Sequence, residues 1–330
     1  MKIILSTIGY GRSGGTESVA RDLAWGLLKR GYDFSVLTET SVGDHTPIHV
    51  TNDLNILRSA DVVFQVGAFS MMDYEVLEMR RRKLFHAPLL IWSIEPCEKF
   101  FRWMTDPQTG LPQDKIMFAY SVEYALHHLQ HVGLAHLGFK IRYGVPTIIG
   151  RPGFRKKRGI TTSKMFLTAG GFDIRKKQHE LIKTFKEVNP PDTTLVVTGH
   201  RGLGNAPQEQ EGVRVLVPDD RQELMDAMYE SDLLIMNSEA EGFGLVLLEA
   251  MFNKTRWAAN KVGATRFKED LKDYGYVYEN EEGLKQAFAE YEKIDVMKAF
   301  RFAEANHTID VMVNDAEAAL RTLLTKSGGK

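Results

Sequence analysis

Two glutamates separated by seven residues give this sequence its clearest chemical pattern. Glu241 precedes two loop glycines, Gly242 and Gly244, and Glu249 lies about two helical turns further on. Glycines let a backbone approach a ligand closely, and the amides at a helix N-terminus favour a phosphate. Carboxylates accept hydrogen bonds from sugar and ribose hydroxyls. The pattern therefore predicts a site for a diphosphate with a sugar on each side, which describes a nucleotide-sugar.

The segments on either side of Glu241 must form a strand and a helix for such a site to exist. The apolar run Leu233–Met236 is bounded by turn-type residues and predicts a buried parallel strand. From Leu245 onward the apolar residues follow helical spacing. Glutamates at this spacing also occur on ordinary helices, where one is solvated and the other is partly buried. The glycine-containing loop directly after a buried strand favours a binding site over that alternative.

A second group of residues suited to an anion follows another predicted strand, 164–169. Gly170 and Gly171 end this strand, and three consecutive cations occupy positions 175–177 before a predicted helix. Backbone amides at such glycines cradle a phosphate, while arginine and lysine side chains supply charge. A basic helix start at the surface is the alternative interpretation, but cations are disfavoured at a helix N-terminus. A bound diphosphate would compensate them.

A third glycine-rich loop lies near the start of the chain. Gly9, Gly11 and Gly14 satisfy G-x-G-x-x-G between a predicted strand and a predicted helix, and Glu39 follows the next strand. This arrangement is typical of dinucleotide binding, in which the loop meets the pyrophosphate and an acid binds the ribose. An NAD-dependent oxidoreductase therefore stays open as an alternative function. Thermal stabilisation by NAD, and not by UDP or GDP, would favour it.

The length and composition fit a two-domain globular protein. The chain has 330 residues, of which 43% are hydrophobic and 26% are charged, and its net charge is −1. A net charge this small gives no reason to expect a stable complex with nucleic acid. A single cysteine, Cys97, excludes an internal disulfide and a cysteine-based metal site. With no signal peptide, no apolar run of about 20 residues and no acidic metal motif, we expect a cytoplasmic protein that needs no metal or other cofactor.

Two stretches resemble family 4 glycosyltransferases of GT-B fold. Residues 238–251 are similar to the E-x7-E region of that family, in which EGFG-x-x-x-x-EAM is a frequent form. Residues 14–37, which begin Gly-Gly-Thr-Glu, are similar to its amino-terminal segment. The resemblance implies an α/β fold of two doubly wound Rossmann-like domains facing across a cleft. It implies an acceptor-side domain over 1–150, a donor domain over 164–309 and a C-terminal helix over 310–330 that packs back on the first domain. Residues 151–163, rich in glycine, proline and basic residues, are expected to be the linker between the domains.

The resemblance also implies a reaction, the retaining and metal-independent transfer of a hexose from a nucleoside-diphosphate-sugar. By this resemblance Glu241 would orient the donor sugar and Glu249 the ribose. Lys176 and Arg175 would stabilise the departing diphosphate. Glu95, just beyond a predicted strand, is a candidate on the acceptor side. The residues expected to bind the donor are Gly14, Gly15, Gly170, Gly171, Gly242, Phe243, Gly244 and Glu249.

Three departures from the family pattern leave other functions open. Gly171 stands where an arginine is usual, Tyr143 stands where an asparagine is usual, and residues 253–256 replace a G-x-P-V sequence. A catalytically silent binding protein and a nucleotide-sugar epimerase on the same scaffold are therefore alternatives. The acceptor also stays open between a glycan, a lipid-linked group and a nucleic-acid hydroxyl such as that of DNA. A lipid-linked acceptor would bring peripheral contact with a membrane.

Overall fold

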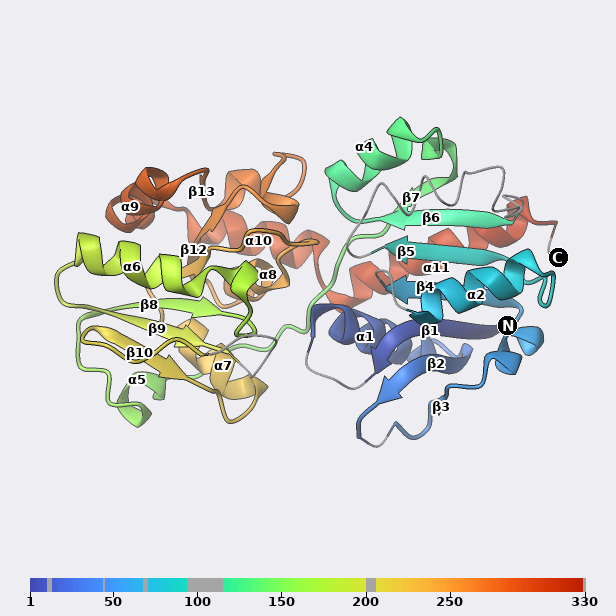
Figure 1. The fold of residues 1–330 in the computed structure, drawn as a ribbon, viewed down its shortest axis with the longest axis horizontal. Coiled ribbons are helices and arrows are strands. Elements are labelled where there is room, and N and C mark those ends of the chain that lie inside the picture. The colour runs from blue at the N-terminus through green and yellow to red at the C-terminus, as the bar shows by residue number, and fades with distance from the viewer. Residues whose placement is uncertain (11–13, 44, 68–70, 94–114, 200–205, 329–330) are drawn as a thin grey trace. The chain divides into compact units, whose positions relative to one another are not determined.

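The computed structural model describes residues 1–330 except 11–13, 44, 68–70, 94–114, 200–205 and 329–330. The chain forms two compact units, the first from 1–145 with 307–330 and the second from 146–306 (Figure 1). Each unit contains a parallel sheet with helices on both faces, which confirms the predicted α/β fold class. No helix among the described residues is long and apolar enough to cross a membrane.

The sheet of the first unit is doubly wound. Its described strands are β1 (Lys2–Tyr10), β2 (Asp33–Ser41), β3 (His49–Thr51), β4 (Val62–Gly67), β5 (Leu89–Ser93), β6 (Ile116–Tyr120) and β7 (Gly138–Lys140). They are parallel and lie in the order β3-β2-β1-β4-β5-β6-β7. The direction of winding therefore changes between β1 and β4, where Ser6 lies opposite Gln65.

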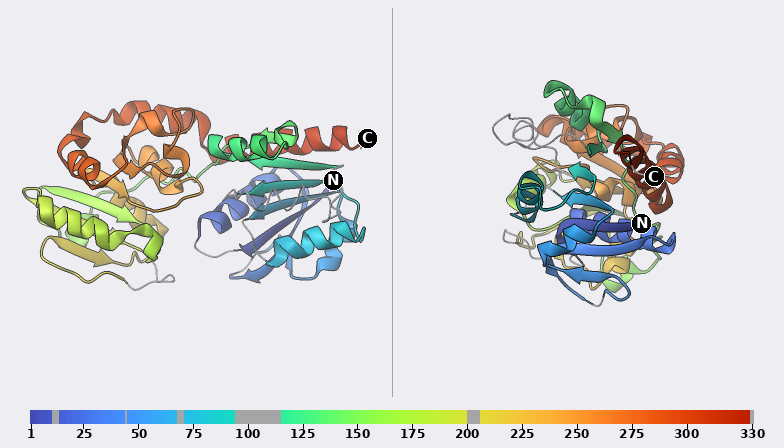
Figure 2. Two further views of the ribbon diagram at one scale, coloured as in Figure 1. Left: turned by 45° about the horizontal axis from the view of Figure 1, so that its top comes forward. Right: turned by 90° about the vertical axis from the view of Figure 1, so that its right-hand side faces the viewer.

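The helices of the first unit cover both faces of this sheet (Figure 2). Those described are α1 (Gly15–Lys29), α2 (Met71–Arg81), α4 (Glu123–His131) and α11 (Ile309–Lys326), with short 3-10 turns η1 (Leu54–Ser59) and η2 (Ala135–Leu137). Helices α2 and α4 share a buried core with β1, β4, β5 and β6. Helices α1 and α11 pack against each other on the other face. Helix α1 forms because its apolar residues recur at helical spacing and are buried together.

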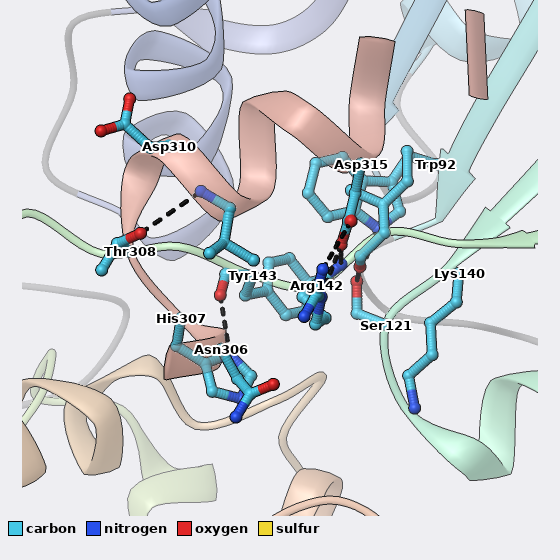
Figure 3. A network of polar contacts seen from close by, with 12 residues as sticks. Trp92, Ser121, Lys140, Arg142, Tyr143, Asn306, His307, Thr308, Asp310 and Asp315 are labelled. Carbon is cyan, nitrogen blue, oxygen red and sulfur yellow. Dashed lines mark hydrogen bonds and ion pairs between the residues drawn. The ribbon is translucent and has the colours of Figure 1, made fainter. Parts of the chain in front are cut away.

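Helix α11 returns the end of the chain to the first unit. Arg142 donates two hydrogen bonds of 2.8 Å to the carboxylate of Asp315 on this helix (Figure 3). Arg30, which follows α1, donates to Glu317 at 2.5 Å. These ion pairs join segments far apart in the sequence. The last helix therefore belongs to the first unit although it follows the second unit along the chain.

Tyr143, one of the departures from the family pattern, fills a buried position beside α11. Its ring stacks on Trp92 with ring centroids 5.0 Å apart. Its carbonyl accepts a 2.8 Å hydrogen bond from Nδ1 of His307 (Figure 3). Burial lowers the pKa of His307 to about 4, so the imidazole is neutral near pH 7. Tyr143 is thus a core residue of the first unit, which accounts for a large aromatic side chain at this position.

The second unit repeats the doubly wound plan. Its described strands are β8 (Lys164–Ala169), β9 (Thr193–Thr198), β10 (Val213–Leu216), β11 (Leu233–Met236), β12 (Arg256–Asn260) and β13 (Tyr276–Tyr278). They are parallel and lie in the order β10-β9-β8-β11-β12-β13. The winding changes direction between β8 and β11.

The helices of the second unit also form two layers. Those described are α5 (Phe154–Lys157), α6 (Gln178–Val188), α7 (Arg221–Tyr229), α8 (Leu245–Phe252), α9 (Glu281–Glu290) and α10 (Val296–Asn306), with 3-10 turns η3 (Ile174–Lys176), η4 (Gly263–Thr265), η5 (Lys272–Tyr274) and η6 (Tyr291–Lys293). Helices α6 and α9 cover a core in which Phe166, Phe185 and Phe288 contact one another. Helix α8 packs between α7 and α10 on the other face.

Residues 151–163, expected to be a linker, form part of the second unit instead. Arg158 donates to Glu223 of α7 at 2.9 and 2.6 Å, and the amide of Arg151 donates to Asp226 at 2.8 Å. The chain passes between the units at 145–146 and again at 306–307. The acids that pair with its basic residues lie on α7 or just before it, so the composition of the segment by itself indicates a linker.

Candidate functional site

The carboxyl ends of β8 and β11 carry the two loops that the sequence predicts to bind an anion. These strands are neighbours, and the helices that follow them lead to opposite sides, α6 toward β9 and α8 toward β12. Doubly wound sheets bind ligands outside the carboxyl ends of their strands at such a point. The loop after β8 spans 170–177 and is called here the lysine loop. The loop after β11 spans 237–244 and is called the glutamate loop.

Lys176 and Glu241 meet across these two loops. Nζ of Lys176 lies 2.5 Å from Oε1 of Glu241, and the same oxygen accepts a 2.5 Å hydrogen bond from Oγ of Ser238. The Lys176 side chain is 29% exposed and that of Glu241 is 15% exposed, so the pair is partly buried yet open to a ligand. The structure therefore brings together two of the three residues that the sequence predicts to be catalytic.

Arg175, the third of these residues, has a different partner. Its guanidinium lies 3.1 Å from a carboxylate oxygen of Asp173, and its side chain is 54% exposed. Hydrogen bonds from the Arg175 side chain and amide lower the pKa of Asp173. The carbonyl of Arg175 accepts a 2.6 Å hydrogen bond from the amide of Glu239. Arg175 thus joins the lysine loop to the glutamate loop through its backbone, while its side chain pairs with the partly buried Asp173.

Helix α8 begins directly after the glutamate loop. Gly244 precedes its first residue with φ of +98°, a left-handed conformation that glycine adopts without strain. Phe243 is 4% exposed, and its carbonyl accepts a 3.0 Å hydrogen bond from the amide of Ala264. The Phe243 side chain therefore anchors the loop in the core. The backbone of Gly242 and Gly244 leads into the N-terminus of α8, whose amides favour an anion.

Glu249 lies on α8, is 8% exposed and forms an ion pair with Arg221, the first residue of α7. A buried carboxylate requires a cation or hydrogen-bond donors, and Arg221 supplies both. The sequence interpretation missed Arg221, although a signal was available. The arginine directly follows Asp220, which caps α7 by accepting from the amide of Glu223. A cation is disfavoured at that end of a helix, so a partner for Arg221 could be expected.

The predicted glycines of the lysine loop lie at the end of β8, close to β9. A Cβ atom on Gly199, which follows β9, would lie 2.3 Å from the carbonyl oxygen of Gly170. Only a glycine at position 199 permits this approach of the two strand ends. Gly170 and Gly171 are both partly exposed beside Lys176.

Gly14 and Gly15 belong to the first unit, where Gly14 caps α1 and Gly15 is its first residue. Glu39 is exposed near the end of β2. Gly11 and Glu95, the latter predicted to lie on the acceptor side, fall outside the described residues. Within the described part of the chain, no group of three or more histidine, cysteine, aspartate or glutamate side chains is placed to hold a metal ion.

Comparisons with known proteins concern the family and the fold of the chain. Residues 151–305 match the model of the family described as glycosyl transferases group 1. No curated protein matches the sequence. Over 98% of its length the chain is similar to all of the sucrose-phosphate synthase of Thermosynechococcus elongatus, at 15% identity and a TM-score of 0.74. It is similar over 98% of its length to all of HepE of Anabaena in complex with UDP, at 16% identity and a TM-score of 0.77.

A third similar structure is that of WaaG, a glycosyltransferase involved in lipopolysaccharide biosynthesis. It is similar over 99% of this chain and 100% of its own, at 16% identity and a TM-score of 0.64. Identities this low establish the fold and not the reaction. The fold is the doubly wound pair of units of the GT-B type, as the resemblance implied.

Proposed function

We propose, on the premise that residues 151–305 form a domain of the group 1 glycosyl transferases, that the protein transfers a sugar from a nucleotide-sugar to a hydroxyl acceptor. The observation that carries this proposal is the pairing of Lys176 with Glu241 between the loops after β8 and β11. The pair supports a donor site because it combines a cation for a diphosphate with a carboxylate for sugar hydroxyls.

In the proposed reaction the bond between the anomeric carbon and the diphosphate oxygen breaks, and its electron pair stays on the diphosphate. The acceptor hydroxyl forms the new bond to the anomeric carbon, and its proton passes to the departing diphosphate. We infer retention of configuration, with the acceptor on the face of the leaving group. Negative charge grows on the leaving oxygen, so a nearby ammonium gains most in the transition state. We assign this role to Lys176.

Glu241 has two roles in this proposal. In the structure its carboxylate pairs with Lys176 and accepts from Ser238 on the same oxygen, so neither partly buried charge lacks a partner. When the donor binds, the diphosphate replaces Glu241 as a partner of the ammonium. The carboxylate is then available to accept hydrogen bonds from the donor sugar and to orient it.

Glu249 and Arg221 define the nucleoside end of the proposed site. The Glu249 carboxylate accepts from a ribose hydroxyl, while its ion pair with the Arg221 guanidinium holds it in orientation. Glu241 precedes α8 and Glu249 lies on it, so the N-terminus of this helix would face the diphosphate between the two sugars. UDP-glucose is the first donor to test, because HepE, which shares the fold, is known in complex with UDP-glucose.

The test combines thermal unfolding with nucleotide release. We expect UDP or GDP to raise the melting temperature and NAD to leave it unchanged. We also expect one nucleotide-sugar of a panel to release its nucleotide. Stabilisation by NAD alone would overturn the transferase and support the oxidoreductase that the Gly9–Gly14 loop suggests.

We also propose that this release does not require a divalent metal, because Lys176 and the N-terminus of α8 supply the positive charge. Nucleotide release should therefore be the same with and without EDTA. Loss of release on chelation, restored by Mg²⁺ or Mn²⁺, would contradict metal independence and leave the transferase intact.

A further inference from the structure

A buried asparagine, Asn237, joins three segments around the donor site. It directly follows β11 and is 8% exposed. Its Nδ2 donates to the carbonyl of Lys177 at 3.2 Å, and its Oδ1 accepts from the hydroxyl of Tyr278 at 2.8 Å. Tyr278, the last residue of β13, is 4% exposed. The asparagine thus connects the lysine loop, the glutamate loop and the end of a more distant strand.

The hydrogen-bonding chemistry fixes the orientation of this amide. The carbonyl of Lys177 only accepts, so the nitrogen of Asn237 must face it and the oxygen must face Tyr278. The tyrosine hydroxyl is therefore the donor, and burial raises its pKa so that it keeps its proton. The same hydroxyl lies 3.4 Å from the carbonyl of Met236. Met236 ends β11 and Asn237 follows it, so either hydrogen bond ties Tyr278 to this segment.

Lys177 is the residue through which the bridge reaches the donor site. It has φ of 46° and ψ of 37°, a left-handed conformation, at the junction of η3 and α6. A residue with a Cβ atom holds this conformation only where its surroundings enforce it. The carbonyl of Lys177 accepts from the amide of Leu181 at 3.0 Å as well as from Asn237. Both lone pairs of the carbonyl are therefore used to fix the peptide.

Lys176 lies between two ties to the glutamate loop. On one side, the carbonyl of Arg175 accepts from the amide of Glu239, a backbone contact that does not depend on residue type. On the other side, the carbonyl of Lys177 is tied to the side chain of Asn237. Relaxation of Lys177 to a right-handed conformation would rotate the intervening peptide. The Lys176 ammonium would then turn away from Glu241.

We propose that Asn237, held by Tyr278, is a positioning residue that fixes the Lys177 carbonyl and thereby aims the Lys176 ammonium at the leaving diphosphate. This assignment rests on the proposed transferase function. In it, Asn237 does not touch the donor, so its loss should lower turnover more than nucleotide affinity. Its effect should also vanish when Lys176 is absent.

The experiment is a double-mutant cycle over the wild type, Asn237→Ala, Lys176→Ala and the double variant. Turnover is measured as nucleotide release at saturating donor, and the Kd for UDP is measured by calorimetry. We expect Asn237→Ala to lower kcat roughly 10- to 100-fold, the loss caused by a misplacement of about 1 Å, and to change the Kd less than about twofold. In the Lys176→Ala background, the same substitution should leave kcat unchanged.

Thr255→Val is the matched control for loss of a buried hydrogen bond. Thr255 is 4% exposed and directly precedes β12, and its Oγ1 donates to the carbonyl of Met228 at 2.6 Å. It therefore lies at the amino ends of the parallel strands, whereas the proposed donor site lies at their carboxyl ends. This variant should lower the melting temperature and leave kcat within about twofold of the wild type. Tyr278→Phe provides a second variant should Asn237→Ala fail to fold. It should lower kcat by a smaller factor, again only when Lys176 is present.

The outcomes distinguish a failure of the positioning role from a failure of the proposed transferase function. Equal losses from Asn237→Ala with and without Lys176 would overturn the positioning role and leave the transferase intact. The positioning role would also be overturned if Tyr278→Phe lowered kcat equally with and without Lys176. A loss of kcat in Thr255→Val as large as in Asn237→Ala would overturn it as well. A wild type that releases nucleotide from no nucleotide-sugar would overturn the proposed function, and the role of Asn237 with it.

Discussion

The two units share one topology, but opposite charges lie at their glycine loops. Both sheets change their direction of winding beside the first strand of the unit, β1 in the first and β8 in the second. At Gly14 in the first unit, a carboxylate oxygen of Glu17 lies 2.0 Å from the position that a Cβ atom would take. At Gly170 in the second unit, the side chain of Lys176 lies 3.5 Å from the corresponding position. An acidic side chain thus lies beside Gly14, and the aliphatic part of a lysine side chain lies beside Gly170.

This difference bears directly on which loop binds an anion. A carboxylate in the first turn of α1 already compensates the positive end of that helix. A pyrophosphate at the same amides would meet a like charge. In our proposal, the ammonium of Lys176 instead favours a diphosphate at the second unit. The first loop therefore has the glycines of the dinucleotide fingerprint in its sequence, with a carboxylate beside Gly14 that would oppose a pyrophosphate there.

The most direct test of this difference between the units is to remove the Lys176 ammonium. We expect Lys176→Ala to lower kcat about 10²- to 10³-fold, the usual effect of removing one preorganised group that stabilises transition-state charge. The affinity for UDP should fall less, because the amides of both loops still bind the diphosphate. Arg175→Ala should have a smaller effect on kcat, since its side chain is half exposed and pairs with Asp173.

Lys183→Ala is the matched control for Lys176. Lys183 lies on α6 and is 71% exposed, and its ion pair with Glu187 is at the surface. Such a pair contributes little, so the loss of Lys183 should leave kcat unchanged. A Lys176→Ala variant that turns over at the wild-type rate and merely needs more donor would reduce the lysine to a binding residue. A larger loss in Arg175→Ala would mean that the roles of the two cations are reversed.

The units should also differ in the pH at which each loses stability. In the first unit, burial holds the pKa of His307 at about 4, below its ordinary value of 6.5. The unfolded chain then binds a proton that the folded chain does not, so stability falls as pH drops from 6.5 to about 4, by roughly 3 kcal/mol in all. Arg142 lowers this pKa further and Asp315 raises it.

In the second unit the titrating group is a glutamate. Burial alone would raise the pKa of Glu223, but hydrogen bonds from Arg158, the Asp219 amide and Lys157 lower it to about 2 from an ordinary 4.5. Its contribution is therefore complete above pH 4.5 and is lost between 4.5 and 2. The measurement is urea unfolding at a series of pH values. In His307→Asn, whose amide still donates to Tyr143, the free energy of unfolding should no longer fall between pH 6.5 and about 4. Glu223→Gln should remove only the fall in unfolding free energy between pH 4.5 and 2. An identical pH profile in the two variants would contradict the assignment.

Glu249→Ala should weaken nucleotide binding while the protein stays folded. A buried carboxylate that accepts from a ribose hydroxyl contributes about 1.5–3 kcal/mol, so the Kd for UDP should rise roughly 10- to 150-fold. The substitution also leaves Arg221 without its carboxylate, and Arg221→Ala in the same background should then have little further effect. An unchanged Kd by calorimetry would remove Glu249 from the nucleotide site.

The features that could be predicted from the sequence are local ones. A strand, a glycine loop and a helix lie within 20 residues of one another around Glu241, and their periodicity is legible without tertiary information. The same reasoning indicated an anion site at the three cations of 175–177, and the family resemblance singled out Lys176 among them. The resemblance also implied the doubly wound α/β fold, which agrees with the alternation of predicted strands and helices.

The features that could not be predicted depend on contacts between distant residues. Arg221 meets Glu249 from 28 residues away, and Glu223 turns the expected linker into structure from 65 residues away. Asn253, a departure from the family pattern, accepts from the amide of Gly150 at 2.7 Å, which holds a segment more than 100 residues earlier. The sequence around a residue does not show which distant residue becomes its partner, because that depends on how the whole chain folds.

The smallest expected effect is the most informative about the first unit. Glu17→Gln removes the negative charge at its glycine loop and keeps the size of the side chain. Because the donor is held mainly by the second unit in our proposal, the Kd for UDP should change less than about threefold, and any change should be a tightening, since a repulsive charge is lost. The fold should lose about 0.3–1 kcal/mol, the contribution of an acid in the first turn of a helix. NAD should still fail to stabilise the variant. If Glu17→Gln instead acquires NAD binding, the first loop is a dinucleotide site that one carboxylate suppresses. The contrast between the units would then rest on a single side chain.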